Sequence, residues 1–153
     1  MDLAPDFKDL LEEFARDAVE LVLVGGYAVA YHGRPRATKD IDLVLVGTSA
    51  NLERAARALE RFGAPPSVVS AVLTMSVDDV VYMGQPPLRI DFLRSIDGVA
   101  TADLYARSII GELDGIPLRV ISIDDLIENK RTVGRKQDKL DVEFLEQVRA
   151  KRQ

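Results

Sequence analysis

The 153-residue sequence contains no cysteine, so it can form neither a disulfide framework nor a thiolate metal site. Its apolar runs all end well before the ~20 residues that a membrane-spanning helix requires. The first ten residues, MDLAPDFKDL, begin acidic and lack the apolar core of a secretory signal. These absences argue against secreted and membrane-spanning proteins, and we therefore expect a cytoplasmic protein.

Positive charge is also in short supply, since 20 basic residues stand against 25 acidic ones and give a net charge of −5. Such a balance argues against a protein that coats nucleic acid through its overall charge. The basic residues are nevertheless clustered, in RPR at 34–36 and in KRTVGRKQDK at 130–139. These two clusters permit local contact with the end of one nucleic-acid stem.

The length and the apolar content of 47% are typical of one globular domain, which we assign to residues 1–153. Periodicity and turn residues predict helices over 5–20, 27–33, 51–63, 101–108, 123–133 and 139–150, with a further short helix between 64 and 79. They predict strands over 20–24, 40–46, 80–83 and 88–93 and a hairpin over 109–122 that turns at Asp114-Gly115. In the last helix, Leu140, Phe144, Leu145 and Val148 are expected to face inward. We expect an α/β (α+β) fold, with a mixed sheet of about five strands and helices packed mainly on one face.

Two aspartates interrupt the strand DIDLVLV at positions 40 and 42. Residues two apart on a strand point to the same face, so Asp40 and Asp42 present their carboxylates side by side while Ile41 and Leu43 face the core. In the later strand LRIDFL, Asp91 is again a lone carboxylate among apolar residues. If the two strands are neighbours, Asp91 joins the pair.

Three carboxylates at such close range repel one another unless a cation lies between them. Oxygen ligands, with no cysteine and a single histidine in the chain, favour Mg²⁺ or Mn²⁺ over zinc. Three carboxylates can hold two such ions ~3.5–4 Å apart, which is the separation used in phosphoryl transfer. The sequence therefore predicts that Asp40, Asp42 and Asp91 form a site for two metal ions.

Gly25 and Gly26 lie between a predicted strand and a predicted helix. Glycine allows a phosphate to approach the backbone without a clashing Cβ, and free backbone N–H groups at the start of a helix favour anions. The order of a strand, Gly-Gly, a helix, a loop and a carboxylate strand therefore suits a nucleoside triphosphate held above metal ions.

The stretch VGGYAVAYHGRPRATKDIDLVL resembles the signature of the polymerase-β-like nucleotidyltransferase superfamily, and RIDF resembles its third-carboxylate motif. Arg36, Thr38, Asp40 and Asp42 are similar to the Arg-x-Thr-x-Asp-Ile-Asp form of a small bacterial branch with abortive-infection and toxin–antitoxin members. The tail from residue 122 resembles the same branch, in which a helix lysine, here Lys130, contacts the triphosphate. The Arg-Lys-x-Asp stretch that follows this lysine, here Arg135, Lys136 and Asp138, also resembles that branch.

The resemblance implies transfer of a nucleoside monophosphate from an NTP such as ATP to a hydroxyl, with release of pyrophosphate. Asp40 and Asp42 would bind the metal ions, and Asp91 would help to deprotonate the acceptor. Gly25, Gly26, Thr38 and Lys130 would contact the nucleotide.

Several assignments remain open at this stage. Arg36, Arg135 and Lys136 are candidate contacts to the acceptor or to phosphate, although for the last two a solvated face or an ion pair with Asp138 is favoured over direct contact. The acceptor would be an RNA 3′ end, a protein side chain or a small antibiotic, and a cognate partner protein is possible in a toxin–antitoxin setting. The rival hypothesis is a non-catalytic, nucleotide-binding antitoxin or regulator. His32 shows no partner in the sequence and is predicted to be incidental.

Overall fold

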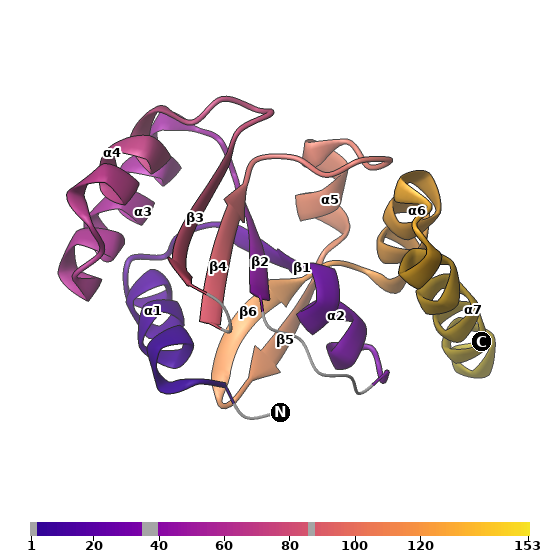
Figure 1. The fold of residues 1–153 in the computed structure, drawn as a ribbon. Helices are drawn as coiled ribbons and strands as arrows, with labels where there is room; N and C mark the ends of the chain where they lie inside the picture. The colour runs from indigo at the N-terminus through magenta and orange to yellow at the C-terminus, as the bar shows by residue number, and fades with distance from the viewer. Residues whose placement is uncertain (1–2, 35–39, 86–87) are drawn as a thin grey trace.

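The computed structural model describes residues 3–34, 40–85 and 88–153 (Figure 1). Its helices are α1 (Pro5–Arg16), α2 (Gly25–Tyr31), α3 (Ser49–Phe62), α4 (Pro66–Thr74), α5 (Thr101–Arg107), α6 (Ile123–Val133) and α7 (Lys136–Arg152). Its strands are β1 (Leu21–Val24), β2 (Asp40–Leu45), β3 (Val80–Gln85), β4 (Leu88–Leu93), β5 (Ile109–Leu113) and β6 (Ile116–Val120). None of the helices within these residues is long and apolar enough to cross a membrane.

The strands form one mixed sheet in the order β3-β4-β2-β1-β6-β5. β1 pairs antiparallel with β2 and parallel with β6, while β2 pairs parallel with β4. The two outer pairs, β3 with β4 and β5 with β6, are antiparallel. The predicted fold class is confirmed, although the sheet formed by the described residues has six strands rather than about five.

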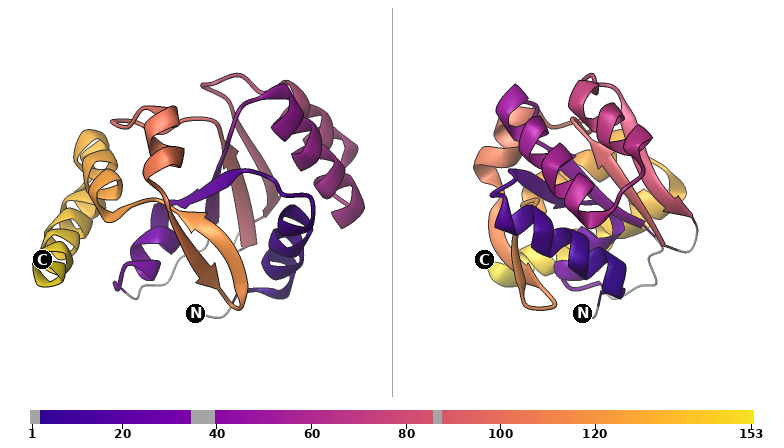
Figure 2. Two further views of the ribbon diagram at one scale, coloured as in Figure 1. Left: turned by 180° about the vertical axis from the view of Figure 1, so that it is seen from behind. Right: turned by 90° about the vertical axis from the view of Figure 1, so that its left-hand side faces the viewer.

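One face of the sheet is apolar and is covered by α1, α3 and α4, which lie together on the same side (Figures 1 and 2). Phe14 of α1 packs edge-on against Phe92 of β4, with their ring centroids 5.9 Å apart. Ile41 and Leu43 of β2 are 1% and 0% exposed, as the alternation of the strand predicts. Thr48 caps the N-terminus of α3, because its side chain accepts a hydrogen bond from the backbone N–H of Asn51.

α6 and α7 pack against each other on the other side of the molecule, beyond α2 (Figure 1). Ser122 caps α6, because its side chain accepts a hydrogen bond from the backbone N–H of Asp125. The inward prediction for α7 is wrong at Leu140, which is 45% exposed, and right at Leu145, which is fully buried. The reason is that Asp138 and Asp141 occupy inward positions of α7, where they pair with a buried lysine of α6.

Candidate active site

The carboxylates predicted to act together lie on two adjacent strands, because β4 pairs with β2 in parallel register. Asp42 lies opposite Asp91 and Asp40 lies opposite Arg89. Positions two apart share a face, so these four side chains form a compact group on the face opposite the apolar one. The structure therefore places Asp91 beside the Asp40–Asp42 pair, although these residues are far apart in the sequence.

Asp42 is the carboxyl group most affected by this crowding. Burial, the charge of Asp91, a hydrogen bond with Asp91 and the charge of Asp40 together raise the pKa of Asp42 to about 7, and Arg89 opposes the rise. Below about pH 7, the protonated form of Asp42 is thus favoured in the folded protein when no other cation is bound. A divalent cation would relieve the repulsion that causes this shift.

Because folding raises the pKa of Asp42, the metal-free protein should lose stability as the pH rises from about 4 to about 7. The contribution is fully present below the pKa of the unfolded chain and is lost as Asp42 ionises in the folded state. Asp42→Asn removes this loss, so the difference in stability between the variant and the wild type should shift by about 2–3 kcal/mol in favour of the variant from pH 5 to pH 8. Urea unfolding in a chelator tests this, with the exposed Asp103→Asn as control. An equal pH dependence in wild type and Asp42→Asn would contradict it.

Arg89 is a member of this group that the sequence analysis missed. Its Nε lies 2.9 Å from Oδ1 of Asp91, one Nη donates to Oδ2 of Asp91 at 3.1 Å, and the same Nη lies 3.5 Å from Asp40. Its guanidinium also stacks over the ring of Tyr82 on β3, 5.3 Å from the ring centroid. The available signal was its position two residues before Asp91 on one strand, which places both side chains on the same face.

Gly25 is required here for a reason that differs from the predicted one. Its φ is +72°, in the left-handed region that favours glycine, and a Cβ at this position would lie 2.1 Å from Oδ2 of Asp42. The absence of a Cβ at Gly25 therefore leaves the space that the Asp42 carboxylate occupies. Gly26, the next residue, is buried within α2, so Gly25 is the one that adjoins the carboxylates.

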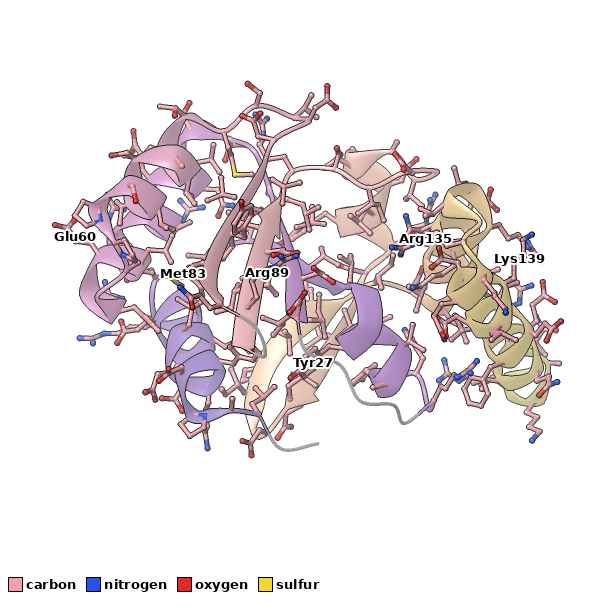
Figure 3. The ribbon with its side chains drawn as sticks, viewed as in Figure 1. Tyr27, Glu60, Met83, Arg89, Arg135 and Lys139 are labelled. Atoms are coloured by element: carbon pink, nitrogen blue, oxygen red, sulfur yellow. The ribbon has the colours of Figure 1, made fainter. Side chains whose placement is uncertain are left out.

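A polar cavity of about 370 Å³ opens over these carboxylates. It is lined by residues from β1, β2, β4, α6 and the start of α7, namely Val24, Gly25, Asp40, Asp42, Arg89, Asp91, Leu93, Ile96, Asn129, Lys130, Val133, Arg135 and Asp138. Figure 3 labels Arg89 on β4 and Arg135 beside α6 and α7, on two sides of this region. The cavity thus gathers acidic residues of the sheet and basic residues of the C-terminal helices.

Lys130, a predicted phosphate contact, lines this cavity but is already paired. Its Nζ lies 3.1 Å from Asp138 and 3.3 Å from Asp141, and its side chain is only 6% exposed. Burial alone would raise the pKa of Asp138, but hydrogen bonds from Arg135 and Lys130 outweigh it and lower the pKa to about 2. The ion pair links α6 to α7, and a contact between Lys130 and phosphate remains a prediction.

Removal of the lysine takes the most buried cation away from two buried carboxylates, although Asp138 keeps Arg135 and Asp141 keeps Arg34 at 3.6 Å. Lys130→Ala should therefore destabilise the protein by about 3–5 kcal/mol, measured by urea unfolding at pH 7. Lys139→Ala, at an exposed position on α7, should change the stability by less than about 0.5 kcal/mol. Similar stabilities for the two variants would contradict a structural role of this ion pair.

The outcomes differ for the remaining predicted site residues. Arg36 and Thr38 lie outside the described residues. Arg135 donates through Nε to Asp138 at 2.8 Å, which confirms the ion pair named as an alternative, and Lys136 is exposed in the first turn of α7.

His32 is not without a partner, contrary to the expectation. Its buried ring lies with Nε2 2.8 Å from the backbone oxygen of Ile121, a distance at which it donates a hydrogen bond. Burial lowers the pKa of His32, so the neutral ring is favoured. The histidine joins the end of α2 to the chain after β6 and is structural.

Two features of the carboxylates suit a divalent cation. Oδ1 of Asp91 is buried and accepts no hydrogen bond from the described residues, although Nε of Arg89 lies 2.9 Å from it as an ion pair, and Asp42 carries the raised pKa of a crowded carboxyl group. Hard oxygen donors of this kind suit Mg²⁺ or Mn²⁺. Within the described ranges, however, no three Asp, Glu, His or Cys side chains are grouped as they would be around an ion. The carboxylates therefore have the chemistry to bind a divalent cation. In this structure, the guanidinium of Arg89 lies among them.

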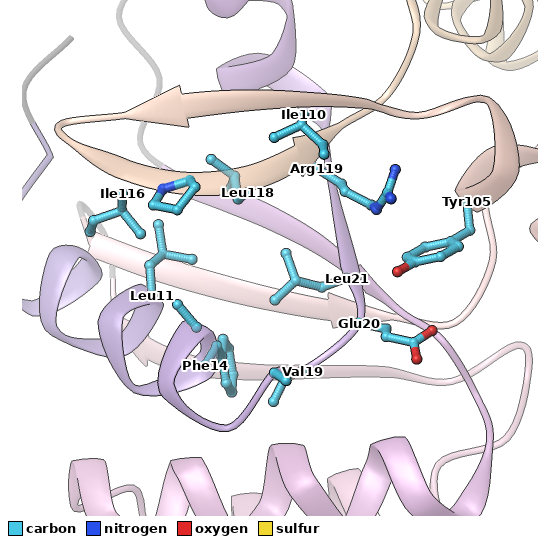
Figure 4. Close-up of a pocket in the computed structure, with 13 residues that line it drawn as sticks. Leu11, Phe14, Val19, Glu20, Leu21, Tyr105, Ile110, Ile116, Leu118 and Arg119 are labelled. Carbon is cyan, nitrogen blue, oxygen red and sulfur yellow. The ribbon is translucent and has the colours of Figure 1, made fainter.

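A second pocket, of about 260 Å³, is mostly apolar, and none of its described lining residues also lines the first (Figure 4). It lies between α1, the start of β1, Tyr105 of α5 and the β5–β6 hairpin. None of the predicted site residues that the structure describes lines it.

Comparison with known proteins identifies the family. Residues 9–132 match the model of a family described as the nucleotidyl transferase AbiEii toxin of a type IV toxin–antitoxin system, and no curated protein matches. Among solved structures, a candidate nucleotidyltransferase from Thermotoga maritima is similar in fold, at 17% identity and a TM-score of 0.59 over 94% of this chain and 88% of that one. ANT(2″)-Ia in complex with adenylyl-2″-tobramycin is similar at 18% identity and a TM-score of 0.57, over 94% and 92%. The chain is thus a nucleotidyltransferase of the polymerase-β-like superfamily and belongs to the AbiEii family.

Proposed function

We propose that this nucleotidyltransferase requires Mg²⁺ and transfers a nucleoside monophosphate from a nucleoside triphosphate to a hydroxyl group of an acceptor. The observation that supports it most strongly is the placement of Asp40, Asp42 and Asp91 side by side on paired strands beneath a polar cavity. Asp40 and Asp42 would hold two divalent cations, with Asp91 as the third ligand. Bound cations of this kind lower the pKa of an attacking hydroxyl and neutralise charge on the departing pyrophosphate.

The chain's own residues have separate tasks in this proposal. Asp91 accepts the proton of the acceptor hydroxyl, whose oxygen forms a bond to the α-phosphorus. The bond between the α-phosphorus and the oxygen that bridges to the β-phosphate breaks, and pyrophosphate leaves. Gly25 and Gly26 would let the β- and γ-phosphates approach the backbone, and Lys130, which lines the cavity, would add positive charge.

An RNA 3′ end is the acceptor that we favour, with a protein side chain or a small hydroxylated antibiotic as alternatives. Two basic residues at the start of α7 support an anionic acceptor: the side chain of Arg135 is 73% exposed, and Lys136 is exposed beside it. Exposed cations at the rim of an acidic cavity can hold a phosphate backbone while its terminal hydroxyl enters. The description of the family as a type IV toxin supports a cognate partner protein.

Label transfer from each of the four α-³²P-labelled nucleoside triphosphates tests the proposal. Reactions with Mg²⁺ should label RNA, and an excess of chelator should reduce the labelling by at least about 100-fold. Parallel reactions contain a protein mixture or an aminoglycoside in place of RNA, so that the label identifies the acceptor.

Two other outcomes are informative. Labelling that persists in the chelator would contradict the metal requirement. Tight calorimetric binding of a nucleotide with no transfer to any acceptor would favour the non-catalytic regulator instead.

A further inference from the structure

Arg89 occupies a position that the proposed chemistry does not use. It lies on the same face of β4 as Asp91 and opposite Asp40 of β2, so its guanidinium stands within the carboxylate group. The side chain is 36% exposed, whereas that of Asp91 is 13% exposed. The arginine therefore covers Asp91 from the side of the cavity, which both residues line.

The contacts of Arg89 are those of a counter-ion. It contacts both oxygens of Asp91, at 2.9 and 3.1 Å, and reaches Oδ2 of Asp40 at 3.5 Å. The guanidinium thus bridges two of the three carboxylates that the proposed function assigns to metal ions. The guanidinium is therefore held mainly by charge, with one hydrogen bond from its Nη to Oδ2 of Asp91.

Tyr82 supports this arrangement from the neighbouring edge strand. It lies opposite Asp91 in the β3–β4 pairing and is itself 62% exposed. Its ring lies 5.3 Å from the guanidinium of Arg89, within the range of a cation–π contact. The arginine therefore has a second contact that does not involve a carboxylate, and this contact can persist when the ion pairs are broken.

We propose that Arg89 is an internal counter-ion that bridges Asp40 and Asp91 in the metal-free protein and is exchanged for a divalent cation when the site is loaded. This inference rests on the proposed function, since it requires the same carboxylates to bind metal. Arg89 is then a positioning residue: it keeps Asp40 and Asp91 close together without the ion, and it competes with the ion for them. Among the neighbouring charges, Asp91 has the largest effect on the pKa of Asp42. Arg89 compensates the charge of Asp42 only in part.

The competition predicts the direction of a change in metal affinity. Arg89→Gln removes the positive charge and should tighten Mn²⁺ binding in the absence of nucleotide by about 10-fold or more, because a charge this close to a divalent ion is weakly screened. Arg89→Lys keeps the charge but lacks a fork that can bridge two carboxylates, and it should give an intermediate affinity. Arg135→Gln removes an exposed charge from the rim of the same cavity and should change the affinity by less than about 3-fold.

Mn²⁺ affinity is measured by the electron paramagnetic resonance signal of the free ion, with circular dichroism to confirm the fold of each variant. As a second readout, the Nε–Hε resonance of Arg89, assigned by its loss in Arg89→Gln, should shift on titration of the wild type with Mg²⁺. Equal Mn²⁺ affinities for wild type and Arg89→Gln, or an equal tightening in Arg135→Gln, would overturn the exchange. A resonance that stays in place while Mg²⁺ binds would also overturn it. Absence of Mn²⁺ binding in every variant would instead overturn the proposed function together with this inference.

Discussion

Asp42→Asn should reduce label transfer by about 10³-fold, which corresponds to ~4 kcal/mol of activation free energy. Asparagine keeps the size of the side chain but removes a charged ligand from the centre of the carboxylate group. Asp42 is the suitable position because it lies opposite Asp91 in the strand register and two residues from Asp40. Transfer should be measured at saturating Mg²⁺, so that a weakened metal affinity is separated from a slower chemical step.

The same substitution should not unfold the protein, which makes the loss of activity interpretable. The pKa of Asp42 is raised to about 7, so removal of its charge relieves repulsion in the metal-free protein at pH 8. A variant that is inactive and yet at least as stable as the wild type is the expected combination. Asp103→Asn, at an exposed position on α5, is the matched control and should retain full activity. Transfer by Asp42→Asn at the wild-type rate would remove this residue from the mechanism.

Gly25→Ala should destabilise the protein by about 3 kcal/mol and reduce transfer by a factor similar to that of Asp42→Asn. Two effects add: alanine is strained at a φ of +72°, and its Cβ would lie 2.1 Å from Oδ2 of Asp42. The second effect must displace either the backbone or the carboxylate. Urea unfolding measures the stability, and label transfer measures the activity.

Gly63→Ala separates these two effects. Gly63 ends α3 with a φ of +95°, but a Cβ there would meet nothing within 4 Å. Alanine at this position should therefore cost only about 1 kcal/mol, from backbone strain alone, and should leave transfer unchanged. If Gly25→Ala were no more harmful than Gly63→Ala, the close approach of Asp42 to Gly25 would not hold the site together.

The order of elements was predictable because the apolar patterns of this chain are regular. DIDLVLV and LRIDFL have the alternation and β-branched content of strands, and the segment around Ser122 and Asp125 has the chemistry of a helix cap. The sequence alone did not determine which strands are neighbours in the sheet. The proximity of Asp91 to Asp42 followed only on the condition that β4 lies beside β2, and the parallel pairing fulfils that condition.

Charged partners were harder to predict, since their pairing depends on tertiary contacts. A lysine in a helix is usually exposed, and the sequence around Lys130 does not indicate otherwise. Its buried ion pair with Asp138 and Asp141 arises because α7 folds back on α6. The same ion pair explains why α7 turns aspartates inward and leaves Leu140 exposed. Arg89 was overlooked because an arginine next to an apolar strand residue usually extends into solvent, whereas here Asp40 and Asp91 hold it.

The most direct test of the central claim, that Asp40, Asp42 and Asp91 hold divalent cations, is the anomalous scattering of Mn²⁺ in crystals grown with a non-hydrolysable nucleoside triphosphate. We predict anomalous peaks within about 2.0–2.3 Å of carboxylate oxygens of Asp40, Asp42 and Asp91, with the guanidinium of Arg89 withdrawn from Asp91. Peaks at other side chains, or a triphosphate bound away from Gly25 while Arg89 still bridges Asp40 and Asp91, would contradict the account.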